Sequence, residues 1–96
     1  MDYEASWHED ALKDLKKIDK AAARKIIDKV KYYLVLNPVG LGKPLKGNFK
    51  GLLRYRIGDY RVVYVVDHEA RLVRILAVNH RKSVYRMTRL PGDRSG

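Results

Sequence analysis

The sequence contains no cysteine, which excludes a disulfide framework and a thiolate metal site. Long apolar runs are also missing: the longest, such as VVYVV at 62–66, are far too short to span a bilayer. The opening MDYEASWHED has no apolar stretch like that of a secretory signal peptide. We therefore expect a cytoplasmic protein with no membrane partner and, at 96 residues, a single domain.

Acidic residues are scarce, with 11 Asp and Glu against 21 Lys and Arg and a formal net charge of +10. Such a charge favours a polyanionic partner, such as nucleic acid, an acidic protein or an anionic surface. The alternative is a basic surface that is merely solvated. The sequence thus indicates a class of partner and leaves its identity open.

The basic residues are unevenly distributed between the two halves of the chain. Residues 1–48 hold nine lysines and a single arginine, whereas residues 49–96 hold two lysines and nine arginines. Lysine on helices is ordinary solvated charge, but arginine suits bidentate recognition of phosphate and stacking on bases. We therefore expect the residues that bind the partner to lie in the second half of the chain.

Residue spacing divides the chain into short strands and two helices. Apolar residues recur every three or four positions between Leu12 and Tyr33, which is typical of amphipathic helices, and Asp19 is the expected cap that divides this run in two. Asn37-Pro38 ends the second helix, because the residue before a proline is disfavoured in helical geometry. The expected elements are a strand at 2–8, helices at 9–18 and 20–36, a loop at 37–51, strands at 52–57, 60–67 and 71–79, and a short helix at 82–89.

This order, β-α-α-β-β-β, predicts an α+β fold. A helical hairpin would pack its apolar stripe on one face of a small, mostly antiparallel sheet. We expect one domain over residues 1–90 and a flexible tail at 91–96.

Three arginines are predicted to share one face of this sheet. Gly58-Asp59 suits a two-residue type II′ turn, which would place Arg56 opposite Arg61. Strand alternation then puts Arg54 on the same face and leaves an apolar face for the helices. Because like charges directly opposite one another destabilise a strand pair, the arrangement indicates an anion-binding face, unless the arginines simply fan apart into water.

A second basic group follows the last strand in the segment AVNHRKSVYR. Histidine can exchange a proton near neutral pH, tyrosine can stack on a base, and arginine can stabilise charge on a phosphate. A surface histidine and a core tyrosine are the alternatives for His80 and Tyr85. No spacing of histidines and carboxylates indicates a metal site, and we expect no cofactor. The group consists of His80, Arg81, Lys82, Tyr85 and Arg86.

Together these segments resemble a known family. LLRYRIGDYRVVYVVD followed by RILAVNHRKSVYR is similar to the RelE branch of the RelE/ParE toxins of bacterial and archaeal toxin–antitoxin systems. KPLKGNFKG and the opening WHEDALKDLKKI also resemble family segments, so the similarity covers about residues 2–88. The resemblance implies a RelE-like fold and a small ribosome-dependent endoribonuclease, which cuts messenger RNA in the aminoacyl site by metal-independent attack of a 2′-hydroxyl. It also implies a cognate antitoxin that blocks the site.

The resemblance further implies roles for individual residues. Arg61 matches the family's phosphate-stabilising arginine, and Arg81 matches the one that stabilises charge or protonates the leaving 5′-oxygen. Tyr85 matches a tyrosine that stacks on the base at the cleavage site. We assign Arg54, Arg56, Lys82 and Arg86 to RNA binding.

The general base is where this chain departs from the family pattern. The best-studied type has paired lysines where this chain has Arg54 and Arg56. Because an arginine keeps its proton, it is a poor base, and we hypothesise that His80 takes this task.

Three other interpretations remain open. The ParE type of the same superfamily inhibits DNA gyrase and shares the fold, and fold alone does not determine function. The chain could also be an inactive module that binds RNA or antitoxin, or a basic domain with no enzymatic role.

Overall fold

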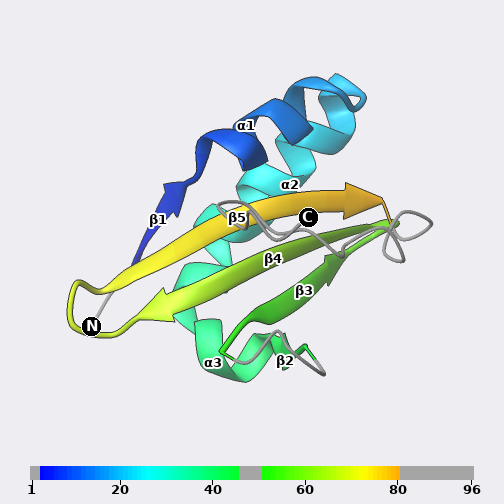
Figure 1. Ribbon diagram of the computed structural model, residues 1–96. Coiled ribbons are helices and arrows are strands. Elements are labelled where there is room, and N and C mark those ends of the chain that lie inside the picture. The colour runs from blue at the N-terminus through cyan, green and yellow to red at the C-terminus, as the bar shows by residue number, and fades with distance from the viewer. Residues whose placement is uncertain (1–2, 46–50, 81–96) are drawn as a thin grey trace.

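The computed structural model describes residues 3–45 and 51–80, and all structural statements below concern these two ranges (Figure 1). Their elements, in chain order, are β1 (Glu4–Trp7), α1 (Glu9–Lys16), α2 (Lys20–Tyr32), a 3₁₀ turn (Leu34–Leu36), α3 (Pro38–Leu41), β2 (Lys43–Pro44), β3 (Leu53–Ile57), β4 (Tyr60–Asp67) and β5 (Leu72–His80).

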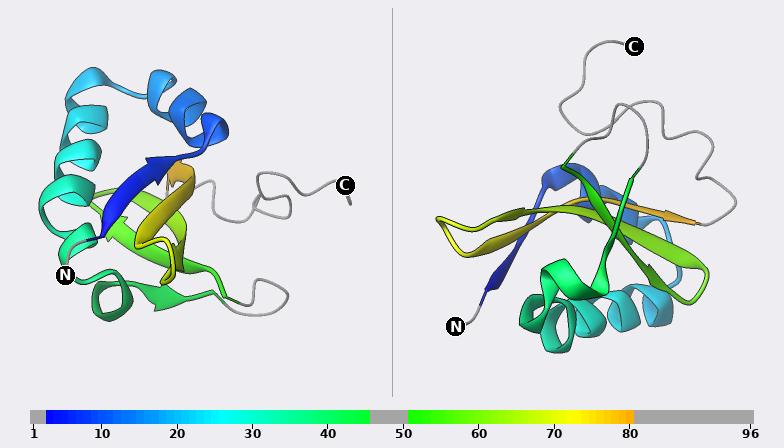
Figure 2. Two further views of the ribbon diagram at one scale, coloured as in Figure 1. Left: turned by 90° about the vertical axis from the view of Figure 1, so that its left-hand side faces the viewer. Right: turned by 90° about the horizontal axis from the view of Figure 1, so that it is seen from below.

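The five strands form one mixed sheet in the order β1-β5-β4-β3-β2. β1 runs parallel to β5, and every other neighbouring pair is antiparallel. Figure 2 shows α1 and α2 together on one side of this sheet. The predicted α+β class, with a helical hairpin on one face of a mostly antiparallel sheet, is therefore confirmed.

The core lies between the helices and the sheet face that they cover. Alternation along β4 directs Val62 and Tyr64 into it, where they belong to the same buried cluster as Ile26 and Val30 of α2. The apolar face predicted from strand alternation is thus the buried one, and the arginines of β3 and β4 lie on the opposite face. The cluster of buried residues is Ala11, Leu15, Ile26, Val30, Leu34, Ile57, Val62, Tyr64, Val73, Ile75 and Val78.

Both helices begin at a side-chain cap. The Asp19 carboxylate accepts hydrogen bonds from the backbone N–H groups of Ala21 and Ala22, at 3.0 and 3.2 Å, as its predicted capping role requires. In α1 the imidazole of His8 accepts from the N–H of Asp10 at 3.0 Å. These caps set the break that separates the two helices of the hairpin.

The segment after α2 differs from the prediction. The predicted helix 20–36 is too long: α2 ends at Tyr32, because the backbone of Tyr33 leaves helical geometry, and a 3₁₀ turn follows. The loop predicted over 37–51 contains a further helix, α3, and a short strand, β2. Pro38, expected to stop a helix, begins one, because its missing N–H is not needed in a first turn and Asn37 caps it by accepting from Gly40 at 3.1 Å.

Helix α1 also anchors the far end of β5. β1 pairs with β5 only as far as Ile75, so the backbone beyond that point has no strand on this side. There the carboxylate of Asp14 accepts a hydrogen bond from the N–H of Val78 at 2.9 Å. This contact ties the last residues of β5 to α1, next to the candidate site.

Candidate nucleic-acid interface

A shallow hollow of about 280 Å³ lies on the sheet face that carries the arginines. Four of its six lining residues are cations and none is acidic, which suits an anionic ligand. We call it the arginine hollow. Its lining residues are Leu41, Lys43, Arg54, Tyr55, Arg56 and Arg61.

The register of β3 and β4 brings the three predicted arginines together. Arg56 pairs with Arg61 and Arg54 pairs with Val63, as the two-residue turn predicted. Gly58 has a positive φ of 61°, whereas the φ of Asp59 is not positive. This combination agrees with a type II′ turn. Because a shift of one residue would turn every side chain to the opposite face, this turn determines where the arginines point.

Arg56 and Arg61 lie directly opposite each other, and part of their repulsion is relieved locally. The Nε of Arg56 donates a hydrogen bond of 3.1 Å to the carbonyl oxygen of Gly58, which directs its side chain toward the turn. Arg56 is exposed, whereas Arg54 and Arg61 are half-buried. An anion bound between these cations would lower the repulsion that remains.

Lys43 is a member of the hollow that sequence reasoning missed. It belongs to β2, where it pairs with Arg54 across the antiparallel β2–β3 ladder. Only the strand pairing reveals that Lys43 belongs to the site, because a two-residue strand within a glycine-rich segment has no periodicity of its own. The pairing adds a fourth cation beside Arg54.

The end of β5 separates two neighbouring residues onto different faces. Asn79 pairs with Arg61, so it lies on the arginine face, and its Nδ2 is buried with no hydrogen-bond partner among the described residues. His80 pairs with Tyr60, whose ring it meets edge-on with ring centroids 5.2 Å apart. Since Tyr60 packs against the core, His80 lies on the helix side of the sheet. The structure therefore places Asn79 and not His80 beside Arg61.

The remaining predicted site residues lie outside the described residues. They are Arg81, Lys82, Tyr85 and Arg86. The predicted helix at 82–89 and the predicted tail at 91–96 lie there too.

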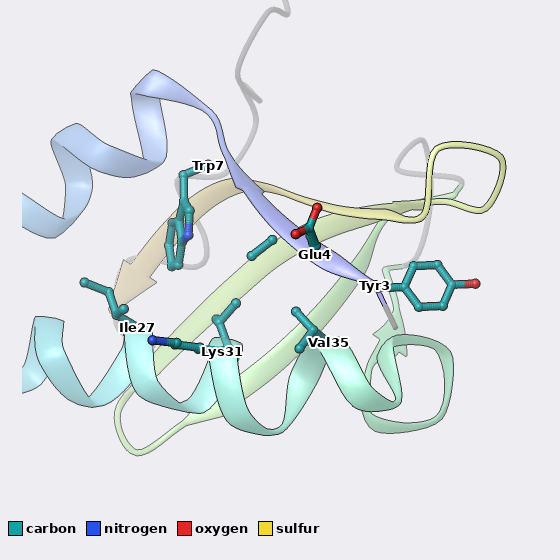
Figure 3. Close-up of a pocket in the computed structure, with 8 residues that line it drawn as sticks. Tyr3, Glu4, Trp7, Ile27, Lys31 and Val35 are labelled. Carbon is teal, nitrogen blue, oxygen red and sulfur yellow. The ribbon is translucent and has the colours of Figure 1, made fainter. Parts of the chain in front are cut away.

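A second depression, between β1 and α2, has a different character. Its lining is mostly apolar, and Figure 3 shows the Trp7 side chain extending from β1 toward α2, where Ile27 lies. Glu4 and Lys31 are its charged residues. Over residues 3–45 and 51–80 we find no group of three or more His, Asp or Glu that could hold a metal ion, and no helix long and apolar enough to cross a membrane.

Comparison with known proteins places these features in a family context. The model of the family described as the ParE toxin of type II toxin–antitoxin system parDE matches residues 5–85. Toxin RelE of Mycobacterium tuberculosis is 39% identical over 77 residues, which cover 80% of this chain and 79% of that protein. Toxin RelG of the same organism is 33% identical over 86 residues, which cover 90% of this chain and 99% of that protein.

A solved structure shares both fold and sequence. The toxin–antitoxin complex RelBE2 of M. tuberculosis contains a chain that matches with a TM-score of 0.80 at 31% identity. The match covers 84% of this chain and 100% of that chain.

Proposed function

This chain belongs to the family of ParE toxins of type II toxin–antitoxin systems. Because its similar relatives are RelE and RelG toxins, we propose that it is a ribosome-dependent endoribonuclease that cleaves messenger RNA in the aminoacyl site. As a toxin it is RelE-like, since RelE, RelG and the RelBE2 complex are its relatives. The observation that carries the proposal is the arginine hollow, where four cations and no acid line a surface of a size suited to a phosphate-containing ligand.

The proposed reaction is transesterification within the RNA. The 2′-oxygen forms a bond to the adjacent phosphorus, the bond from phosphorus to the 5′-oxygen breaks, and the products are a 2′,3′-cyclic phosphate and a 5′-hydroxyl. Negative charge grows on the non-bridging oxygens in the transition state. Arg61, half-buried on β4, is the proposed donor to these oxygens, because cations already held in place stabilise developing charge without reorganisation.

The other cations of the hollow would hold the RNA backbone. Lys43, Arg54 and Arg56 line it together with Arg61, and charge-assisted contacts to phosphate position a strand without reading its sequence. The proposed roles of Arg81, in charge stabilisation or in protonating the leaving 5′-oxygen, and of Tyr85, in base stacking, come from the family resemblance. Lys82 and Arg86 are proposed as further RNA contacts on the same ground.

Proton transfer is assigned to His80 on chemical grounds. An imidazole accepts a proton near neutral pH, which a guanidinium does not. The ring lies on the helix side of β5, so this role requires the RNA to pass around the end of that strand to reach it. The proposal therefore makes His80 a separate, testable part of the mechanism.

Two macromolecular partners follow from this proposal. The similar RelBE2 structure is a toxin–antitoxin complex, and we propose that a cognate antitoxin likewise binds this chain. The ribosome is the second proposed partner, and the net charge of +10 suits its RNA.

Inhibition of DNA gyrase is the second candidate function. The observation that favours it is the matching family model, which describes the ParE toxin of parDE. This alternative leaves the arginine hollow without a role in RNA cleavage.

The decisive experiment is a cleavage map on messenger-programmed ribosomes with an empty aminoacyl site, read by primer extension. The wild type is compared with Arg61→Ala and with a matched control, Arg74→Ala, which removes the same charge from the same sheet face. Arg74 is a suitable control because it lies at the other end of that face and its Nη2 donates to Asp67 at 3.1 Å. Naked messenger and a gyrase supercoiling assay are run in parallel.

We expect cleavage within the aminoacyl-site codon that is lost in Arg61→Ala, retained in Arg74→Ala and absent on naked messenger. Intact messenger together with inhibited supercoiling would reject the endoribonuclease and favour the gyrase alternative. Cleavage that survives in Arg61→Ala would reject the assigned role of Arg61.

A further inference from the structure

Two exposed tyrosines mark the end of α2, away from the arginine hollow. Tyr32 is 57% exposed and Tyr33 is 53% exposed, so both rings present much of their surface to solvent. Neither belongs to the buried cluster or to the side chains packed against it. They therefore contribute little to the core, and their position calls for another explanation.

Each of these rings has a lysine ammonium beside it. The Nζ of Lys29 lies 4.5 Å from the ring centroid of Tyr33, and that of Lys31 lies 5.3 Å from the ring centroid of Tyr32. Such cation–π contacts hold a positive charge next to an aromatic surface. A nucleotide can use both groups, since its base stacks on an open ring face while its phosphate pairs with a neighbouring cation.

A shallow hollow of about 480 Å³ adjoins the tyrosines on the outer side of α2. Its lining contains three cations and one acid, so it carries a positive balance. The exposed aliphatic side chains nearby, Leu36 and Val39, are not part of its lining. We call it the α2 surface; it is lined by Ala21, Arg24, Lys25, Asp28, Lys29, Tyr32 and Tyr33.

The α2 surface continues toward the arginine hollow around the β3–β4 turn. A Cβ placed on Gly58 would lie 3.9 Å from the Nζ of Lys25, so this lysine reaches the turn. From the other side, the Nε of Arg56 donates to the carbonyl oxygen of Gly58. Lys25 and Arg56 thus approach the same residue from different faces of the molecule and join the two basic surfaces.

We propose that the α2 surface is a second RNA-binding site, which takes unpaired nucleotides that run on from the arginine hollow around the β3–β4 turn. This inference rests on the proposed function and deepens it by naming a further contact for the same ligand. RNA is favoured over a protein partner because the lining combines cations with tyrosine rings and lacks large aliphatic side chains.

The test measures binding of a fluorescein-labelled, single-stranded 12-nucleotide uridine RNA by fluorescence anisotropy at several salt concentrations. One variant removes three cations, Arg24→Ala/Lys25→Ala/Lys29→Ala. Its matched control removes two exposed lysines of α1 and the exposed lysine that caps its C-terminus, Lys13→Ala/Lys16→Ala/Lys17→Ala. Thermal unfolding by circular dichroism confirms that each variant folds.

A second pair of variants tests stacking separately from charge. Tyr32→Leu/Tyr33→Leu keeps apolar bulk at both positions but removes the rings. Tyr32→Phe/Tyr33→Phe keeps the rings and removes only the hydroxyl groups. A stacking role predicts a difference between these two pairs, whereas apolar docking predicts none.

We expect the triple α2 variant to bind less tightly and to lower the slope of log Kd against log salt by about 2, since each lost phosphate contact contributes about 0.7 on single strands. The leucine pair should lose at least about fivefold in affinity with an unchanged slope, because stacking is not ionic. The phenylalanine pair and the α1 control should both stay within about twofold of the wild type.

Equal affinities in the wild type, the triple α2 variant and the leucine pair would overturn the proposal. Losses of the same size in the α2 and α1 triple variants would also overturn it, since they would reflect net charge alone. If RNA binding were unchanged while binding of the co-expressed antitoxin fell, the α2 surface would belong to a protein partner. The ribosome cleavage map separates this inference from the proposed function: a wild type that binds the 12-mer through α2 but cuts no messenger would reject only the nuclease.

Discussion

Arg56 and Arg61 face each other across β3 and β4, in a hollow lined by two further cations. Like charges in this position weaken a strand pair, so the site is held at some cost to stability. We predict that Arg61→Gln raises the free energy of unfolding by about 0.5 kcal/mol, by relief of this repulsion. Urea unfolding measures this gain, and the primer-extension assay should show the loss of cleavage that accompanies it.

The control for this prediction is Arg74→Gln. It removes the same charge but breaks a contact with Asp67, whose pKa is lowered by the backbone N–H of Ala70 and by Arg74. This variant should not gain stability. A gain of equal size in both variants would show that net charge, and not the opposed pair, is responsible.

His80 provides a second prediction at the residue scale. If its imidazole is the general base, His80→Gln should lower the single-turnover cleavage rate on ribosomes by about 100-fold, which is typical of a lost proton-transfer group. His68→Gln is the control, because His68 contacts the hydroxyl of Tyr3 at 2.8 Å, in the turn after β4. An unchanged rate in His80→Gln would remove this residue from the mechanism and leave its edge-on contact with Tyr60 as its role.

Which site residues could be predicted depended on the range of the interaction. Arg54, Arg56 and Arg61 were predictable together because a two-residue turn determines the register of both strands. Lys43 and Asn79 were not predictable. Lys43 pairs with Arg54 through β2, a two-residue strand that has no periodicity of its own. Asn79 pairs with Arg61 beyond the shift in register between β4 and β5 at Val63/Tyr64, which the sequence does not reveal.

At the scale of elements, Tyr64 links the sheet to α3. Its hydroxyl donates to the carbonyl oxygen of Pro38 at 2.6 Å, and burial together with the nearby Tyr55 raises its pKa from 10.0 to about 12. Between pH 10 and pH 12 the unfolded chain therefore loses a proton that the folded protein keeps. The contribution of this link is complete below pH 10 and decreases as the pH rises toward 12.

We predict that the free energy of unfolding falls by ~2 kcal/mol from pH 9.5 to pH 11.5 because of Tyr64. Urea titrations at both values measure the fall, and a Tyr64→Phe variant corrects for the other groups that titrate there. A fall of the same size in Tyr64→Phe would contradict the assignment to this hydroxyl.

Gly42 allows α3 and β2 to pass close to the same tyrosine. A Cβ at this position would collide with the Tyr64 hydroxyl and would approach its Cζ to 2.8 Å. We predict that Gly42→Ala lowers the free energy of unfolding by about 1–3 kcal/mol, as overpacking of a core does. Urea unfolding of Gly42→Ala, Tyr64→Phe and the double variant tests the cause: the double variant should be more stable than the sum of the two single effects, and strict additivity would place the strain elsewhere.

The elements themselves were predicted unevenly. Asp19 was identified as the cap of α2 because a short acceptor before a helical run is a local signal. The end of α2 at Tyr32 was missed because apolar spacing continues past it, into the 3₁₀ turn that buries Leu34. Pro38 predicts the end of a helix from the sequence alone, although a proline serves equally well in a first helical turn.

For the whole molecule, the net charge of +10 predicts strongly salt-dependent association with ribosomes. The four cations of the arginine hollow alone should contribute a slope of about −3 in a plot of the logarithm of the association constant against that of salt concentration. Binding of labelled protein to 30S subunits between about 50 and 300 mM KCl measures this slope. An affinity that is flat over this range would exclude a phosphate-dominated interface.

The sequence by itself determined the class of the fold, the register of the arginine hairpin and the sign of the charge, because each depends on local periodicity, turn chemistry or composition. The tertiary structure alone decided which distant residues complete the site. It brought Lys43 beside Arg54 through β2, and it placed Asn79 with Arg61 while turning His80 to the helix side. Such choices depend on strand pairing between segments far apart in the chain, which no local pattern encodes.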